Sequence, residues 1–341
     1  MDNLTHSLVG AVLGQMGLKR KTALAMPTLI LAANLPDIDA GWALYGIESL
    51  AMRRGLTHGP IALLVLPILL CAVMIAFDRW QQMRGKRPPT HPPLCVGWLL
   101  ALAYLGCLSH PAFDWLNNYG IRLLEPFSHR WFYGDMIFII DPWMWIALGS
   151  SVWLSLRHER AGTARWTRPA WIGFAAVCAY ILANGLITEQ AEAQVRTLLR
   201  EQGVDDALVV ASPVPLAFWR RDIFWRDGVR YGSGTYALGR GGAAGPGAPT
   251  GMDDARLRLC AQASPAARAF LFWARMPVAT REGDAFVVRD QRFMQSFAKD
   301  RFMVRVEAPK PAGSDEQAAC GGMTSRERQL SGCGICGTET Q

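Results

Sequence analysis

Two aspartates and three histidines in the N-terminal part of the chain have side chains that can bind a metal. Asp37 and Asp39 lie one residue apart at the end of an apolar run, in the motif NLPDID. His6, His58 and His110 each lie where an apolar run begins or stops. Imidazole and carboxylate groups together suit a divalent cation of hard to borderline character. This combination predicts a metal site, with Zn²⁺ expected and Mn²⁺ as the alternative.

A fourth acidic residue, Asp114, follows His110 by four positions. If a helix continues through Pro111, or restarts there, the two side chains share one face. That spacing suits two ligands, or a ligand and its orienting carboxylate. The alternatives are a helix-terminal histidine with a capping Asp, and turn chemistry for the Asp pair. The predicted metal ligands are His6, Asp37, Asp39, His58, His110 and Asp114.

Three residues, Asp39, Arg54 and Asp141, are candidates for catalysis. Arg53 and Arg54 precede His58, and an arginine there suits an anionic group such as a phosphate. Contact with lipid headgroups is the alternative. Asp141 lies in the apolar motif FIIDPW, where a carboxylate at membrane depth costs about 2.5–3.5 kcal/mol at the bilayer centre. We expect Asp39 or Asp141 to act as general base and Arg54 to offset substrate charge.

The elements that must position these residues are apolar helices. Residues 4–18 and 22–34 predict two helices too short for a span of about 20 residues, and so a tilted or re-entrant hairpin. Gly10 and Gly14 form a GxxxG pattern, which favours close helix contact. Four longer runs predict membrane spans: 60–77, 94–108, 136–156 and 170–187.

Basic clusters predict the orientation of these spans. Residues 19–21, 79–87 and 157–168 hold dense Lys and Arg, which places them in the cytoplasm. The predicted ligands then all lie on the extracytoplasmic side. These clusters also account for the net charge of +7, so the expected partner is the lipid bilayer and no nucleic acid. A site at headgroup level suits a lipid or lipid-linked substrate.

The polar remainder of the chain predicts a second unit. The expected fold class is mainly α, with a multi-span helical membrane domain over residues 1–188, a small α+β extracytoplasmic domain over 189–308 and a disordered tail over 309–341. Cys333 and Cys336 form a lone CxxC, which is weak evidence for zinc or redox chemistry. Expected helices cover 189–201 and 264–275, and expected strands cover 208–210, 218–225, 229–238, 285–289 and 302–306.

Taken together, the motifs Thr5-His6, LPDID (35–39), RGLTH (54–58) and HPAFD (110–114) resemble a bacterial family of inner-membrane proteins described as metal-dependent hydrolases, some of them LexA-regulated. Residues 126–128 and 140–142 also resemble it, and the similarity covers about residues 1–185. That family is distantly similar to zinc-dependent phospholipase C and the fungal zinc nucleases. The resemblance implies zinc and phosphoester hydrolysis. Arg53 departs from the pattern, because His is frequent there in the family.

The function predicted from these features is a metal-dependent hydrolase of the bacterial inner membrane that uses metal-activated water. The alternative is a non-enzymatic scaffold that binds a protein partner, with the His/Asp set as a structural metal site or polar network. A transporter that uses Asp141 as a proton site is less favoured by the small number of spans. The chain has no GxSxG motif and no Gly-rich phosphate loop, which disfavours a serine hydrolase.

Overall fold

The computed structural model describes residues 1–89, 92–294 and 300–307. Helix α1 (Asn3–Gln15) and helix α2 (Ala25–Asn34) form the expected hairpin, joined through the short helix η1 (Leu18–Arg20). Glycines set the distance between the helices. A Cβ on Gly10 would lie 2.7 Å from the Leu29 carbonyl oxygen, and a Cβ on Gly106 of α5 (Val96–Trp115) would lie 2.8 Å from the same atom. Helix α2 is therefore held tightly between α1 and α5.

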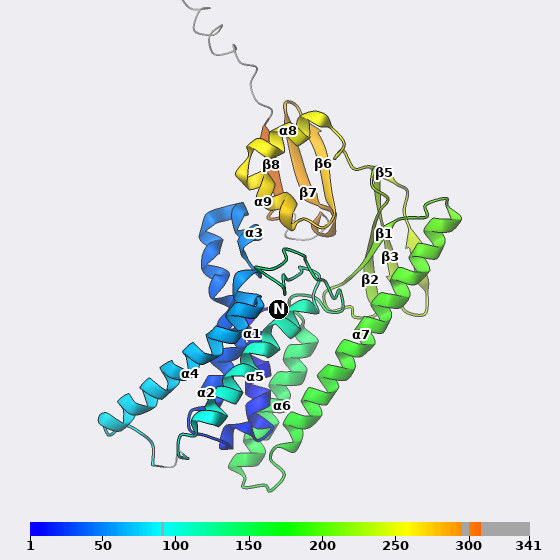
Figure 1. Ribbon diagram of the computed structural model, residues 1–341. Coiled ribbons are helices and arrows are strands. Elements are labelled where there is room, and N and C mark those ends of the chain that lie inside the picture. Colours follow the sequence, from blue (N-terminus) through cyan, green and yellow to red (C-terminus); the bar gives the residue numbers. More distant parts are fainter. Residues whose placement is uncertain (90–91, 295–299, 308–341) are drawn as a thin grey trace, which may run out of the picture.

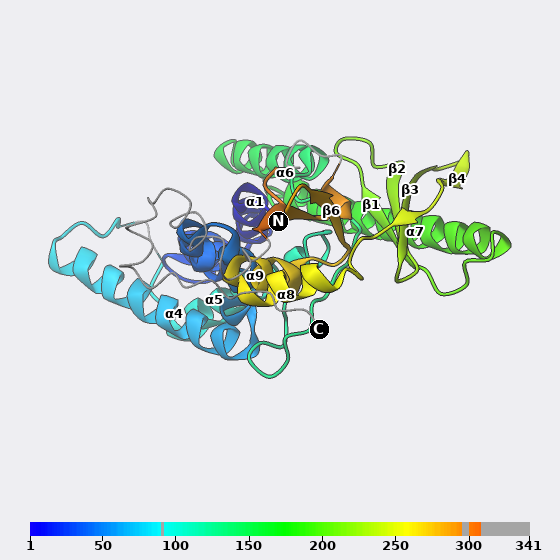
Figure 2. The same ribbon diagram turned by 90° about the horizontal axis from the view of Figure 1, so that it is seen from above.

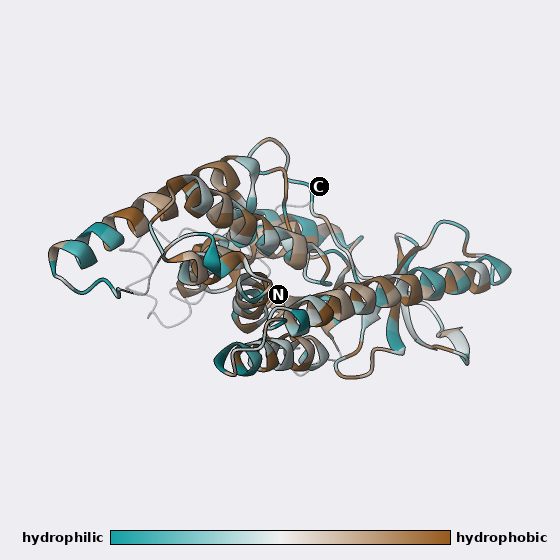
Figure 3. Cartoon of the chain, turned by 90° about the horizontal axis from the view of Figure 1, so that it is seen from below, coloured by the Kyte–Doolittle hydropathy of each residue, from teal (hydrophilic) through white to brown (hydrophobic). Residues whose placement is uncertain are grey.

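Within the described residues, three helices are long and apolar enough to cross a membrane: α4 (Pro60–Met83), α5 and α7 (Arg168–Glu201). Hydrophobic residues run along α4 and most of α7, and hydrophilic residues gather at the C-terminal ends of both (Figure 3). The expected span over 136–156 is not one of these three candidate spans. Its helix, α6 (Pro142–Arg160), begins later than expected, because Asp141 caps it by accepting hydrogen bonds from the Trp143 and Met144 amides.

Helix α7 continues past the membrane-spanning length without a break, so the predicted boundary at residue 188 lies inside a helix. Its C-terminal part supports an antiparallel sheet in the order β1-β2-β3-β4, with β5 paired to β3 (Figure 1). Ala191, Val195 and Leu199 of α7 pack against Ile223 and Trp225 of this sheet. The strands are β1 (Leu208–Pro213), β2 (Arg220–Arg226), β3 (Arg230–Ala237), β4 (Gly241–Ala244) and β5 (Ala248–Pro249).

A second antiparallel sheet, in the order β6-β7-β8, packs with α8 and α9 over the loops at this end of the bundle (Figures 1 and 2). Tyr119, from the loop after α5, stacks at a tilt on Trp273 with ring centroids 5.2 Å apart. We call this unit the roof. It comprises α8 (Ala255–Ala263), α9 (Pro265–Trp273), β6 (Pro277–Glu282), β7 (Ala285–Asp290), η4 (Gln291–Phe293) and β8 (Met303–Glu307).

The described residues of the C-terminal part are thus α+β, as expected, and they form two separate sheets. Strands β4, β5 and β6 and helix α8 were not predicted. The predicted disordered tail, with Cys333 and Cys336, lies outside the described residues. The basic segments 19–21, 79–87 and 157–168 lie at the end of the bundle remote from the sheets (Figure 1). Lys19 and Glu159 form an ion pair there.

Candidate metal centre

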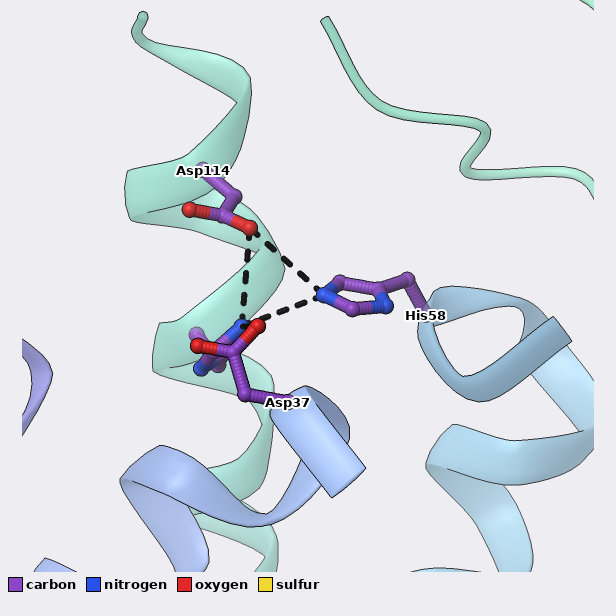
Figure 4. A group of neighbouring side chains, drawn as sticks. Asp37, His58 and Asp114 are labelled. Atoms are coloured by element: carbon purple, nitrogen blue, oxygen red, sulfur yellow. Dashed lines mark hydrogen bonds and ion pairs between the residues drawn. The ribbon is translucent and has the colours of Figure 1, made fainter. Parts of the chain in front are cut away.

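Four of the six predicted ligands meet at the sheet end of the bundle. Asp37 lies in η2 (Leu35–Glu48), His58 in η3 (Leu56–His58), and His110 and Asp114 in α5. One ligand atom from each lies within 4.8 Å of all the others, and all four residues are buried. Figure 4 shows Asp37, His58 and Asp114 pointing from three separate elements toward a common centre. His110 and Asp114 share a helix face, as their spacing predicted.

The distances between these atoms fit a metal polyhedron. The two Nε2 atoms of His58 and His110 are 3.1 Å apart, and each is 3.5 Å from Asp114 Oδ2. His110 Nε2 is 3.7 Å from Asp37 Oδ1. Ligands about 2.0–2.1 Å from a tetrahedral Zn²⁺ are separated from one another by about 3.3 Å. The donor atoms therefore have nearly the spacing that a bound cation requires.

The tautomers of the two histidines strengthen this fit. His110 Nδ1 lies 2.7 Å from the Ala33 carbonyl oxygen, which can only accept a hydrogen bond, so Nδ1 carries the proton. Thr57 Oγ1 donates to Asp39 Oδ2 at 3.0 Å and therefore accepts from His58 Nδ1 at 2.9 Å. Both Nε2 atoms then present lone pairs to each other. Two lone pairs at 3.1 Å beside two carboxylates repel unless a cation lies between them.

His6 and Asp39, also predicted as ligands, lie beside this group. The His6 ring stacks on His110 with centroids 3.8 Å apart, and its Nε2 is 3.4 Å from Asp114 Oδ1. Neither ring nitrogen of His6 has a hydrogen-bond partner. The Met1 amino group also contacts Asp114 Oδ1. This oxygen thus faces α1, while Oδ2 faces the other two histidines.

Asp39 orients the centre through its Oδ2 atom. Besides Thr57, this oxygen accepts a hydrogen bond from the Arg54 amide at 2.7 Å. The other oxygen, Oδ1, is buried with no hydrogen-bond partner. Burial raises the pKa of Asp39 above its usual value, although the Arg54 amide and the Thr57 hydroxyl oppose that rise. Burial, with smaller effects from His110 and Arg54, lowers the pKa of His58 well below its usual value, which keeps the imidazole neutral and able to ligate.

The two adjacent arginines have different surroundings. Arg54 is buried with a positive φ of 53°, and its guanidinium lies 3.0 Å from Asp114 Oδ2 and donates to Asp114 Oδ1 at 3.1 Å. It also donates to Asn117 and to the Gly120 carbonyl. These contacts make Arg54 a residue that positions Asp114. Arg53 is half-buried, and its side chain forms no ion pair or hydrogen bond with the described residues.

Asp141 has a capping role. Its Oδ1 accepts from the first amides of α6, and its Oδ2 accepts from the Tyr180 hydroxyl at 3.0 Å. The dipeptide Asp141-Pro142 was a helix-start signal, because Asp favours the N-cap and Pro the first turn. Thr57, which fixes the His58 tautomer, was missed as a functional residue. Its position next to His58 was the available signal.

The region that contains this centre matches a known protein family. A family model described as YdjM inner membrane protein matches residues 1–191. No curated protein and no solved structure matches the chain. The matched region contains the four converging residues and ends within α7, before both sheets.

Proposed function

We propose that this chain, which belongs to the YdjM inner membrane protein family, is a metal-dependent hydrolase that acts on a phosphoester or another ester at the membrane surface. The observation that carries this proposal is the pair of inward-facing Nε2 atoms, 3.1 Å apart and joined by two carboxylates. Zn²⁺ is the expected ion, with Mn²⁺ as the alternative, since two imidazoles and two carboxylates suit both. Such an ion supplies Lewis acidity and an activated water.

The site belongs to the extracytoplasmic surface in this proposal. The dense Lys and Arg segments lie at the far end of the bundle, and such segments favour the cytoplasmic side. The centre lies at the opposite end of α5, a candidate span. A centre at that end of a span would lie near the lipid headgroups, which supports a lipid or lipid-linked substrate.

Three residues of the chain have defined roles. Asp39 accepts a proton, because its Oδ1 is free of hydrogen bonds while its Oδ2 is held by the Arg54 amide and Thr57. Arg54 holds Asp114 in place. Arg53 binds the anionic group of the substrate, since it is the arginine of the pair without an acidic partner among the described residues.

A second candidate function rests on burial. The side chains of His58, His110 and Asp114 are each 0% exposed, and a closed site is typical of a structural metal. In that case the protein is a membrane scaffold whose sheets bind a partner.

For a hydrolase, the point of substrate entry would be Asp37, which at 9% exposed is the most exposed of the four converging residues.

Purified protein separates the two candidates. We expect about one or more equivalents of metal by mass spectrometry, hydrolysis of bis(p-nitrophenyl) phosphate, and loss of both in His58→Ala. Arg53→Gln should raise KM for this anionic substrate and leave KM for the neutral p-nitrophenyl acetate unchanged. Arg281→Gln, at an exposed position of β6, is the matched control. Bound metal without turnover of either ester would favour the scaffold.

A further inference from the structure

A groove of about 670 Å³ lies between α7 and the segment that follows α5, and none of the four converging residues lines it. One end is apolar, with Trp115 and Met136 facing Ile181, Leu182 and Leu186 of α7. The other end is polar. It is lined by Tyr133, Asp135, Thr188, Glu189, Glu192 and Arg275.

The groove crosses the boundary between hydrocarbon and headgroups. A core of about 30 Å corresponds to about 20 helical residues, so a span that starts at Arg168 reaches the far boundary near residue 188. Leu182 and Leu186 then lie in the hydrocarbon, and Glu189 and Glu192 lie among the headgroups. Leu182 and Leu186 are 65% and 58% exposed, so the apolar end is open to lipid.

Asp135 gives the polar end an unsatisfied acceptor. Asp135 is only 4% exposed and has a positive φ of 52°. Its Oδ2 accepts from Arg275 at 2.6 Å, but its Oδ1 is buried without a hydrogen-bond partner. Such an orphaned carboxylate oxygen is costly unless a donor completes it. Asp135 lines the groove, and a donor of a ligand that reached Oδ1 from there would complete this carboxylate.

The charges of the polar end define that donor. Asp135 is paired with Arg275, and Glu192 is paired with Arg196 at 2.5 Å. Glu189 is exposed and has no ion pair among the described residues. Both residues line the same groove, so a cationic donor bound there would be attracted by the Glu189 charge and would complete the Asp135 carboxylate. Arg275, stacked 4.2 Å from the Tyr133 ring, provides a cation for an adjacent phosphate.

We infer that this groove binds an aminophospholipid from the surrounding leaflet. One acyl chain lies along the apolar side of α7, the ammonium group donates to Asp135 Oδ1 and Glu189, and the phosphate contacts Arg275. An ammonium has three N–H donors, whereas a choline headgroup has none. The groove therefore prefers ethanolamine over choline. It also prefers an ethanolamine headgroup over a glycerol headgroup, because phosphatidylglycerol carries a net negative charge that Glu189 repels. This inference does not depend on hydrolysis at the metal centre.

The test is native mass spectrometry of the full detergent-purified chain, titrated with phosphatidylethanolamine, phosphatidylcholine or phosphatidylglycerol of identical acyl chains. We expect the first to bind about tenfold more tightly, the effect of hydrogen bonds to a charged group. Asp135→Asn should remove that preference. Glu189→Gln, at an exposed position, should reduce it.

A groove-filling variant tests the location. Gly185 lines the groove, and Gly185→Leu should weaken binding of all three lipids. Gly149→Leu on α6 is the control, because a Cβ there meets nothing within 4 Å. Equal affinities for the three lipids, or unchanged selectivity in both Asp135→Asn and Glu189→Gln, would overturn the amine assignment. Wild-type binding by Gly185→Leu would overturn the site itself.

Discussion

Replacing Thr57 by valine tests the tautomer argument directly. Valine keeps the shape of the side chain but lacks Oγ1, which accepts from His58 Nδ1 at 2.9 Å and donates to Asp39 Oδ2 at 3.0 Å. Without it, the nearest acceptor for His58 Nδ1 is Asp39 Oδ2 at 3.5 Å. The ring is then free to move its proton to Nε2, where no lone pair remains for a metal.

The expected loss follows from the known effect of such orienting groups. Removing one costs about 10–100-fold in metal affinity, which corresponds to about 1.4–2.7 kcal/mol. We expect Thr57→Val to bind Zn²⁺ more weakly by that factor. The assay is competition with a chelator of known affinity, followed by mass spectrometry of the metal retained.

Two controls make this result decisive. Thr57→Ser keeps the hydroxyl and should retain wild-type affinity. Thr197→Val removes a hydroxyl from an exposed turn of α7, where it bonds only to the Ala193 carbonyl, and should have no effect. Wild-type affinity in a folded Thr57→Val protein would refute the reasoning, as would an equal loss in Thr57→Ser.

Three further predictions concern stability. Gly106→Ala places a Cβ 2.7 Å from the neighbouring helix, so it should destabilise the bundle by about 1–3 kcal/mol in detergent unfolding, whereas Gly97→Ala, with open space, should not; equal effects would contradict this. Folding lowers the pKa of His58, so below about pH 6.5 the unfolded metal-free chain binds more protons than the folded one. The free energy of unfolding should therefore fall by up to about 1.4 kcal/mol per pH unit as the pH drops. This dependence should be weaker in His58→Gln. Asp290→Asn breaks a buried pair with Arg292, and the roof should lose about 3–5 kcal/mol, seen as faster hydrogen exchange over 265–290; unchanged exchange would count against it.

The sequence was informative about the candidate ligands because each lies near the point where an apolar run begins or ends. His58 precedes α4, and His110 lies near the C-terminal end of α5, so their approach at one end of the bundle was predictable. Asp37 and Asp39 differ in role, although they are nearly adjacent. One faces the centre and the other faces Thr57 and Arg54, and that difference depends on backbone turns in η2 that no spacing rule specifies.

Other roles depended on contacts between distant segments. Arg54 rather than Arg53 reaches Asp114 because Arg54 adopts a left-handed conformation, which its residue type does not predict. Helix α9 and strands β7 and β8 of the roof were predicted, but the position of the roof over the bundle was not. Its position rests on packing of Tyr119 against Trp273 and on a hydrogen bond from Arg292 to the Asn118 carbonyl, contacts that join residues far apart in the chain. The continuity of α7 past residue 188 was missed because its composition changes there while its helix does not.

The four converging residues come from three segments that leave the ribosome one after another, and the last of them ends α5. The set of four donors is complete only when α5 has packed against α2, where Gly106 of α5 lets the two helices approach closely. A metal ion would be held by all four residues only after that step. Such an ion would act as a cross-link, because η2, η3 and α5 would not separate without releasing it.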